Sequence, residues 1–244
     1  IREGLNHRLA LETYGSGDYD VVVGQIEKTW SHDYIHPDYS KVSVTIHCNP
    51  EAPYGGDCYD SNSWGHAMTV SSIIAADTNN NYGMAGVCPN CSVEFYSMYG
   101  DYFEDGWSSG NTRVIAAWEL LLSNGIRVVN MSVGGHTNFN QDIQNAINDA
   151  FDNGLIIVAS AGNNGWDAVT DFHQYSSYDN VIGVAVEGQS NNPVGNYDSS
   201  CDEFGYNCDI LDVSAKNNVA VAMHSEYTLG NEGECMDAYG NIVG

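Results

Sequence analysis

Basic residues are scarce in this chain. Its 244 residues include 7 Lys and Arg against 32 Asp and Glu, which gives a formal net charge of -25. Lys and Arg displace counterions from nucleic acid and bind anionic membranes. Their scarcity therefore excludes nucleic acid and anionic membrane surfaces as partners. We expect most of the acids to keep the protein soluble, with carboxylate clusters that hold cations as the alternative.

Long hydrophobic runs are absent as well. No stretch of about 18 or more apolar residues occurs, so we expect no membrane span. The first residues, Ile1-Arg2-Glu3-Gly4, include no initiator Met and do not resemble a signal peptide. There is no internal repeat, linker or low-complexity tract. We therefore predict a single domain over residues 1–244, in a mature or excised chain whose targeting segment is gone.

Cysteine, in contrast, is plentiful: seven are too many for a typical reduced cytosolic domain of this size. Six of them form local pairs around Gly-, Asn- or Asp-rich segments, namely Cys48 with Cys58, Cys88 with Cys91, and Cys201 with Cys208. These pairs predict stapled loops and a secreted, extracellular protein. For Cys88 and Cys91, the alternatives are a redox pair or half of a zinc site. Cys235 is left over, which suggests a partner outside these residues.

Short apolar runs alternate with helical periodicities along the chain. The runs predict buried strands at residues 20–26, 92–98, 126–133, 155–161 and 181–186. Helices are predicted over 112–122 and 140–153, with Gly125 just past the end of the first and Gly154 as the terminator of the second. In the second, an apolar stripe runs from Ile143 to Phe151. The alternation predicts an α/β fold with three layers and a doubly wound, mainly parallel sheet. In such a sheet the site lies at the carboxyl ends of the strands.

Four segments at these strand ends carry residues suited to catalysis. They are Gly24-Gln25-Ile26-Glu27, Gly65-His66-Ala67-Met68-Thr69-Val70, Val129-Asn130-Met131-Ser132-Val133-Gly134-Gly135 and Val158-Ala159-Ser160-Ala161-Gly162-Asn163. His36-Pro37-Asp38 and the Gly86-Val87-Cys88-Pro89 turn flank the second segment. In type, order and spacing these motifs resemble those of the subtilisin-like serine peptidases, the subtilases. One motif alone would be weak, but four in order, over nearly the whole chain, are specific.

The resemblance implies a serine endopeptidase with a Ser-His-acid triad. His66 would take the proton of the nucleophile and return it to the leaving amine, and a carboxylate would hold its imidazole in the right tautomer. Glu27 occupies the place where the family has Asp. Because glutamate is one methylene longer, the backbone or the imidazole must shift to keep the hydrogen bond. Asp33 and Asp38 are rival carboxylates, but neither ends a predicted strand.

The remaining roles also follow from the resemblance. Asn163 would donate its side-chain amide to the oxyanion of the tetrahedral intermediate. Residues expected to bind the substrate backbone are Ser132, Val133, Gly134, Gly135, Ala161 and Gly162. Many subtilases bind calcium, and the matching elements are Asp38 and the loop that contains Asn80, Tyr82 and Met84. An ordinary solvated Asn-rich loop is the alternative to a calcium site.

The nucleophile itself is missing from these residues. In the family it lies in a Gly-Thr-Ser-x-Ala-x-Pro segment, which residues 1–244 do not contain. The last residue, Gly244, falls where that motif's own glycine would stand. We expect a domain that is incomplete at its C-terminus, with the serine on a separate or autocatalytically cleaved companion segment. The alternative is a catalytically inactive subtilase-like module that binds polypeptide or regulates a partner.

Overall fold

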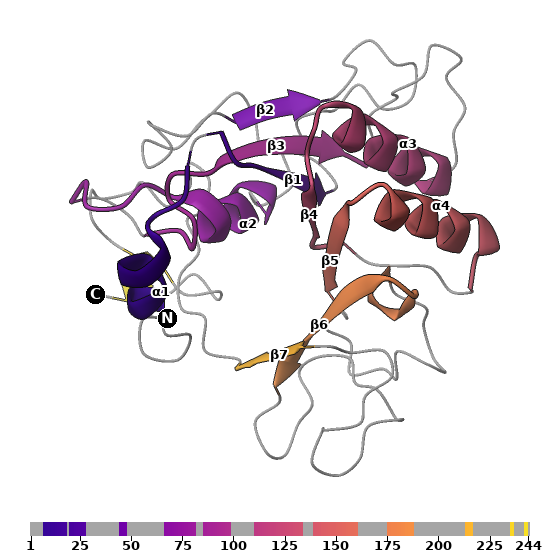
Figure 1. The fold of residues 1–244 in the computed structure, drawn as a ribbon. Coiled ribbons are helices and arrows are strands. Elements are labelled where there is room, and N and C mark those ends of the chain that lie inside the picture. The colour runs from indigo at the N-terminus through magenta and orange to yellow at the C-terminus, as the bar shows by residue number, and fades with distance from the viewer. Residues whose placement is uncertain are drawn as a thin grey trace. The chain divides into compact units, whose positions relative to one another are not determined.

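The computed structural model describes residues 7–18, 20–27, 44–47, 66–81, 85–98, 110–133, 139–160, 175–187, 213–216, 235–236 and 242–243. Its helices are α1 (His7–Tyr14), α2 (His66–Ala75), α3 (Gly110–Ser123) and α4 (Gln141–Asp152), with a 3-10 turn at Tyr175–Ser177. Its strands are β1 (Val22–Glu27), β2 (Val44–His47), β3 (Ser92–Ser97), β4 (Val128–Met131), β5 (Ile156–Ser160), β6 (Val181–Glu187), β7 (Val213–Lys216), β8 (Cys235–Met236) and β9 (Ile242–Val243). Figure 1 labels the four helices and the strands β1 to β7. The chain divides into two compact units, residues 1–113 with 218–244 and residues 114–217.

In the first unit, three parallel strands lie in the order β2-β3-β1. β1 and β3 run in register from Val22 opposite Ser92 to Glu27 opposite Ser97, so the two strands end together. α2 contacts β3. Ile26, Met68 and Phe95 form part of the buried core of this unit, each with no more than 1% of its surface exposed. The core thus holds the last residues of β1 and the start of α2 close together.

The end of α2 is fixed by the turn that the sequence motif predicted. The backbone N–H groups of Gly86, Val87 and Cys88 donate to the carbonyls of Ala76, Ile73 and Ile74 at 2.8–2.9 Å. These bonds pair the last carbonyls of the helix, which have no partner within the helix itself. A Cβ at Gly86 would lie 2.5 Å from the Ala76 backbone nitrogen, so the close approach requires a glycine.

In the second unit, four parallel strands lie in the order β4-β5-β6-β7. α4 connects β4 to β5, and its N-cap Asn140 accepts hydrogen bonds from the backbone of residues 142 and 143. Gly125 and Gly154 follow α3 and α4 with φ of 81° and 86°, the left-handed conformation expected for helix-terminating glycines. Both predicted helix ends are therefore confirmed.

The parallel strands and intervening helices confirm the predicted α/β class. One detail was wrong: Phe151, placed on the core stripe of α4, is 49% exposed, whereas Ile143 and Ile147 are fully buried. Phe151 is two turns from Ile143, and the regular helix has by then rotated it to the edge of the buried face. α1, β2, β8 and β9 were not predicted, because none of them has a long apolar run. The single-domain expectation remains a prediction.

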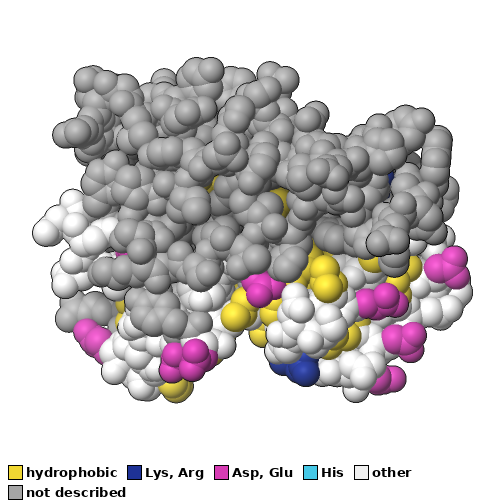
Figure 2. All heavy atoms as spheres, turned by 90° about the horizontal axis from the view of Figure 1, so that it is seen from above, with side chains coloured by type: hydrophobic (Ala, Val, Ile, Leu, Met, Phe, Trp, Pro, Cys, Tyr) yellow, Lys and Arg dark blue, Asp and Glu magenta, His cyan; other side chains and the backbone are white. Residues whose placement is uncertain are grey.

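The described surface matches the charge expected from composition. Asp and Glu side chains are spread over the described part of the face in Figure 2, with little Lys or Arg among them. Among the described residues, no helix combines the length and apolar character needed to cross a membrane.

Candidate active site

Glu27 is the last residue of β1 and is almost fully buried. Its side chain is 4% exposed, whereas that of His66, the first residue of α2, is 60% exposed. His66 Nδ1 contacts Glu27 Oε2. The Glu27 carbonyl also accepts a hydrogen bond from the Met98 backbone at 2.7 Å, just past the end of β3. The backbone of Glu27 is therefore held by a hydrogen bond to the residue after β3, while its carboxylate contacts the imidazole.

This arrangement has a clear chemical meaning. A carboxylate at Nδ1 holds the proton of a neutral imidazole on that nitrogen, so the opposite ring nitrogen, Nε2, becomes the basic one. The carboxylate lies on the buried side and the imidazole is largely exposed, so a reacting group can approach from solvent. Such a pair is suited to general acid–base work at the edge of the sheet. The structure brings Glu27 and His66 together; their catalytic role remains a prediction.

The predicted substrate-binding segments follow two neighbouring strands of the second unit. β4 and β5 pair in parallel, with Met131 opposite Ala159, so both end at the same edge. Ser132 follows β4 directly, and its Oγ accepts a hydrogen bond from the Asn130 side chain at 3.0 Å. Val133 is buried, with 4% of its surface exposed. The other predicted residues of these segments, Gly134, Gly135, Ala161, Gly162 and the oxyanion donor Asn163, lie outside the described residues.

Of the predicted calcium ligands, the structure describes Asn80 alone; Asp38, Tyr82 and Met84 lie outside the described residues. Asn79 and Asn81, on either side of Asn80, have φ of 61° and 59°, in the left-handed region that Asn adopts more readily than most residues. Oxygen donors of this kind suit a hard cation. Among the described residues, no cluster of three or more His, Cys, Asp or Glu side chains is placed to hold a metal. Calcium therefore remains a prediction.

Cys88 and Cys91 form a disulfide, with their Cα atoms 5.4 Å apart. The staple is fastened to the start of the unit: Asn90 donates from its backbone to the Ser16 carbonyl and from its side chain to Ser16 Oγ, both at 2.9 Å. Gly17, with φ of 88°, packs so closely that a Cβ there would overlap the Cys88 sulfur. The structural role is thus favoured over the redox and zinc alternatives.

We expect all three predicted disulfides when the native protein is mapped by mass spectrometry without reduction. Cys48, Cys58, Cys201 and Cys208 lie outside the described residues, so the mapping is their first test. Peptides linking Cys48 to Cys58 and Cys201 to Cys208 are the expected products, because local pairs close small loops in an oxidising compartment. The Cys88–Cys91 peptide is the internal control. Free thiols at all four remaining positions would contradict the extracellular assignment as well.

Two polar residues beside the Glu27–His66 pair were not predicted. Gln25 and Ser71 are both fully buried, and they bond to each other between β1 and α2. The signal in the sequence was a polar residue inside an otherwise apolar strand and another inside an apolar helix.

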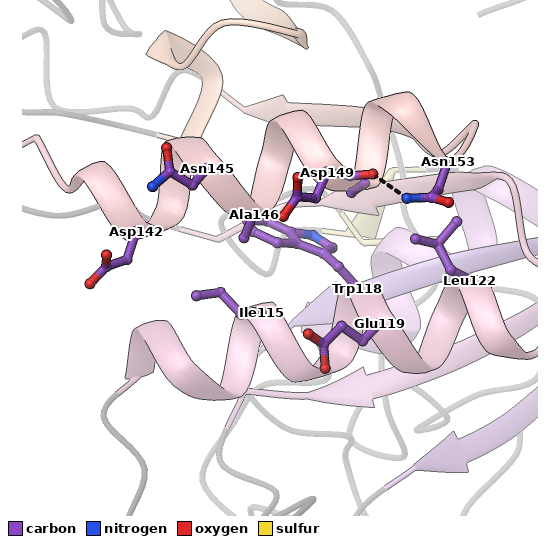
Figure 3. A pocket seen from close by; sticks show the side chains of 10 residues that line it. Ile115, Trp118, Glu119, Leu122, Asp142, Asn145, Ala146, Asp149 and Asn153 are labelled. Atoms are coloured by element: carbon purple, nitrogen blue, oxygen red, sulfur yellow. Dashed lines mark hydrogen bonds between the residues drawn. The ribbon is translucent and has the colours of Figure 1, made fainter.

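A groove lies between α3 and α4 in the second unit (Figure 3). Trp118 and Leu122 of α3 and Ala146 of α4 form its apolar surface, and Glu119 and Asp149 stand at its sides. It contains none of the predicted catalytic or substrate-binding residues.

Comparison with known proteins shows the family to which this chain belongs. Residues 19–241 match the model of the subtilase family, so the chain belongs to the subtilases, a family of subtilisin-type serine proteases. A thermophilic serine proteinase from Bacillus sp. (strain AK1) is 33% identical over 193 residues, which cover 77% of this chain and 44% of the relative. Thermitase from Thermoactinomyces vulgaris is 31% identical over 159 residues, covering 65% of this chain and 51% of the relative.

Solved structures agree. A psychrophilic subtilisin-like protease, Apa1 from Pseudoalteromonas sp. AS-11, superposes with a TM-score of 0.64 at 25% identity, covering 89% of this chain and 46% of that one. The patellamide maturation protease PatA superposes with a TM-score of 0.55 at 22% identity, over 75% of this chain and 63% of that one, which shows the shared fold. The chain thus spans about half the length of the curated relatives it matches.

Proposed function

We propose that this chain forms part of a secreted serine endopeptidase that hydrolyses peptide bonds through a Ser-His-Glu triad. The observation that carries the proposal is the contact between His66 Nδ1 and Glu27 Oε2 at the carboxyl end of β1. Family membership supports the reaction class. The disulfide at Cys88–Cys91 supports an oxidising, extracellular setting.

In the proposed reaction, His66 Nε2 removes the proton from the attacking serine hydroxyl. The Glu27 carboxylate stabilises the imidazolium that forms, and the imidazolium then protonates the leaving amine. Asn163 donates its amide to the oxyanion, and the backbone around Ser132 and Gly162 pairs with the extended substrate. A calcium ion would be held by oxygens of Asp38 and of the loop around Asn80.

The nucleophile is proposed to come from a segment outside residues 1–244, because no Gly-Thr-Ser motif occurs within them. Mass spectrometry of the native protein under denaturing conditions tests this. We expect the serine motif to be found in the same molecule or on a polypeptide that co-purifies. That material should hydrolyse a fluorogenic peptide and lose this activity with a serine-directed inhibitor. A folded, monomeric chain without a serine segment and without hydrolysis would instead support the inactive, polypeptide-binding module.

Replacing Asn163 by Ala should lower turnover by about 10²–10³-fold with a smaller effect on KM, because the lost donor acts on the oxyanion rather than on the bound substrate; this magnitude is that of the equivalent loss in subtilisin. The measurement is kcat and KM on a peptide substrate with the active enzyme. Asn164→Ala is the matched control, since it removes a neighbouring amide of the same kind. If Asn163→Ala kept the same kcat and KM as the Asn164→Ala control, Asn163 would not be the oxyanion donor.

A further inference from the structure

Gln25 lies on β1 two residues before Glu27, so the two side chains point to the same face of the strand. It is fully buried. Its Nε2 donates to the Ala67 carbonyl at 2.8 Å, and its Oε1 accepts a hydrogen bond from the Ser71 hydroxyl. The amide thus bonds twice to α2, once in the first turn, directly after His66, and once a turn further along.

A buried amide in this position needs an explanation other than stability. Burial of a polar group removes its bonds to water, and its net contribution when it is paired again is small. An apolar side chain of similar size would fill the space between β1 and α2 without that penalty. The amide instead fixes the orientation of α2 on β1. Its two bonds to Ala67 and Ser71 would break if α2 rotated about its axis or slid along β1.

The length of Gln25 matches the departure of this chain from its family. Glutamine and glutamate side chains both have two methylenes, so Gln25 and Glu27 reach equally far from the same face of β1. Glu27 is one methylene longer than the family's Asp, so the contact with His66 requires a compensating shift of the backbone or of the imidazole. Gln25, two residues earlier in β1, is equally long and bonds to the first turn of α2, so it can hold the helix at the separation that the longer Glu27 needs.

We infer that Gln25 and Ser71 are positioning residues: together with the Ala67 carbonyl they clamp the start of α2 on β1, so that His66 Nδ1 meets the longer carboxylate of Glu27. The importance of this clamp for catalysis rests on the proposed function. The effect of the clamp on the Glu27–His66 contact can be measured without hydrolysis.

The decisive variant is the double substitution Gln25→Met and Ser71→Ala. Replacing both partners by apolar groups of similar shape is nearly neutral for stability, so we expect a melting temperature within about 4 °C of the parent chain. Nitrogen-15 NMR of the imidazole, at fixed pH, reports its tautomer and the proton on Nδ1. The parent should show one tautomer with a hydrogen-bonded Nδ1 proton, and the double variant should lose that proton signal and mix the tautomers.

Two further variants separate positioning from general damage. Ser72→Ala removes a fully buried hydroxyl from the same helix, one that donates to the Thr69 carbonyl at 2.6 Å, and should leave the His66 signal unchanged. Ser71→Thr keeps the hydroxyl that bonds to Gln25 and should retain the signal. Should the double variant fail to fold, Ser71→Ala alone leaves the bond to Ala67 and should weaken the Nδ1 signal.

The kinetic readout is separate. In the active enzyme, the double variant should lower kcat by about 10²-fold with KM nearly unchanged, the effect of displacing a catalytic group by about 1 Å. A folded double variant with a parental Nδ1 signal, or a Ser71→Ala variant with one, overturns the clamp. Absence of hydrolysis in the parent protein overturns the proposed function instead, while the imidazole spectrum still decides whether Gln25 and Ser71 hold His66.

Discussion

Replacing Glu27 by Ala should lower turnover by about 10⁴-fold in the active enzyme, the effect of losing the triad acid in other serine proteases. The imidazole of His66 would lose the carboxylate that fixes its tautomer and stabilises its charged form. Glu27→Gln keeps the length and removes the charge, and it should be nearly as damaging. Glu27→Asp keeps the charge but falls one methylene short. Because Gln25 holds α2 at a distance set by the longer side chain, aspartate should recover only part of the activity.

The measurement is kcat on a peptide substrate, with the fold checked by circular dichroism. Asp152→Ala, which removes an exposed carboxylate at the end of α4, is the control for the loss of one negative charge and should leave kcat unchanged. An unaltered rate for Glu27→Ala would mean that the acid lies elsewhere. Asp33 and Asp38 would then be tested in the same way.

Most of the fold was predictable because parallel strands covered on both faces have a strong sequence pattern. The strand that starts at Val181 and the helix that ends before Gly154 can be predicted from local sequence alone, because a continuous apolar run and a terminating glycine are local signals. β2 has only four residues and is held by its pairing with β3, a non-local cause. The exposure of Phe151 likewise depends on which neighbours cover the edge of α4, which periodicity alone does not specify.

The Glu27–His66 contact was predictable for a different reason. Both residues lie at recognisable motif positions: Glu27 ends a strand at the carboxyl edge of the sheet, where the site of such a fold lies, and His66 opens the apolar helix α2. The Gln25–Ser71 pair was not predictable, because the two residues are 46 positions apart and neither has a role in the motifs of the family. A buried polar group is expected to have a hydrogen-bond partner, but the sequence does not identify that partner. The sequence showed Glu in place of Asp at position 27, but it did not show that Gln25 and Ser71 accommodate the longer side chain.

Replacing Trp118 by Ala should destabilise the protein by about 3–5 kcal/mol, the largest stability loss that we expect of any single substitution here. Trp118 is 1% exposed on α3, among the largest fully buried side chains of the described residues. Its ring meets Tyr175 edge-on, with centroids 6.3 Å apart and planes at 89°. Truncation would open a cavity under α3 and remove this aromatic contact. Urea denaturation followed by far-ultraviolet circular dichroism measures the effect.

Trp118→Phe is the matched variant, because it keeps an aromatic ring against Tyr175. The indole Nε1 has no hydrogen-bond partner among the described residues, so the substitution removes a buried donor without breaking a bond there. We therefore expect a smaller loss than for Ala, below about 2 kcal/mol, despite the reduced volume. An equal loss for Phe and Ala would show that Nε1 bonds to something outside the described residues. A loss below about 1 kcal/mol for Ala would show that the core around α3 closes over the missing ring.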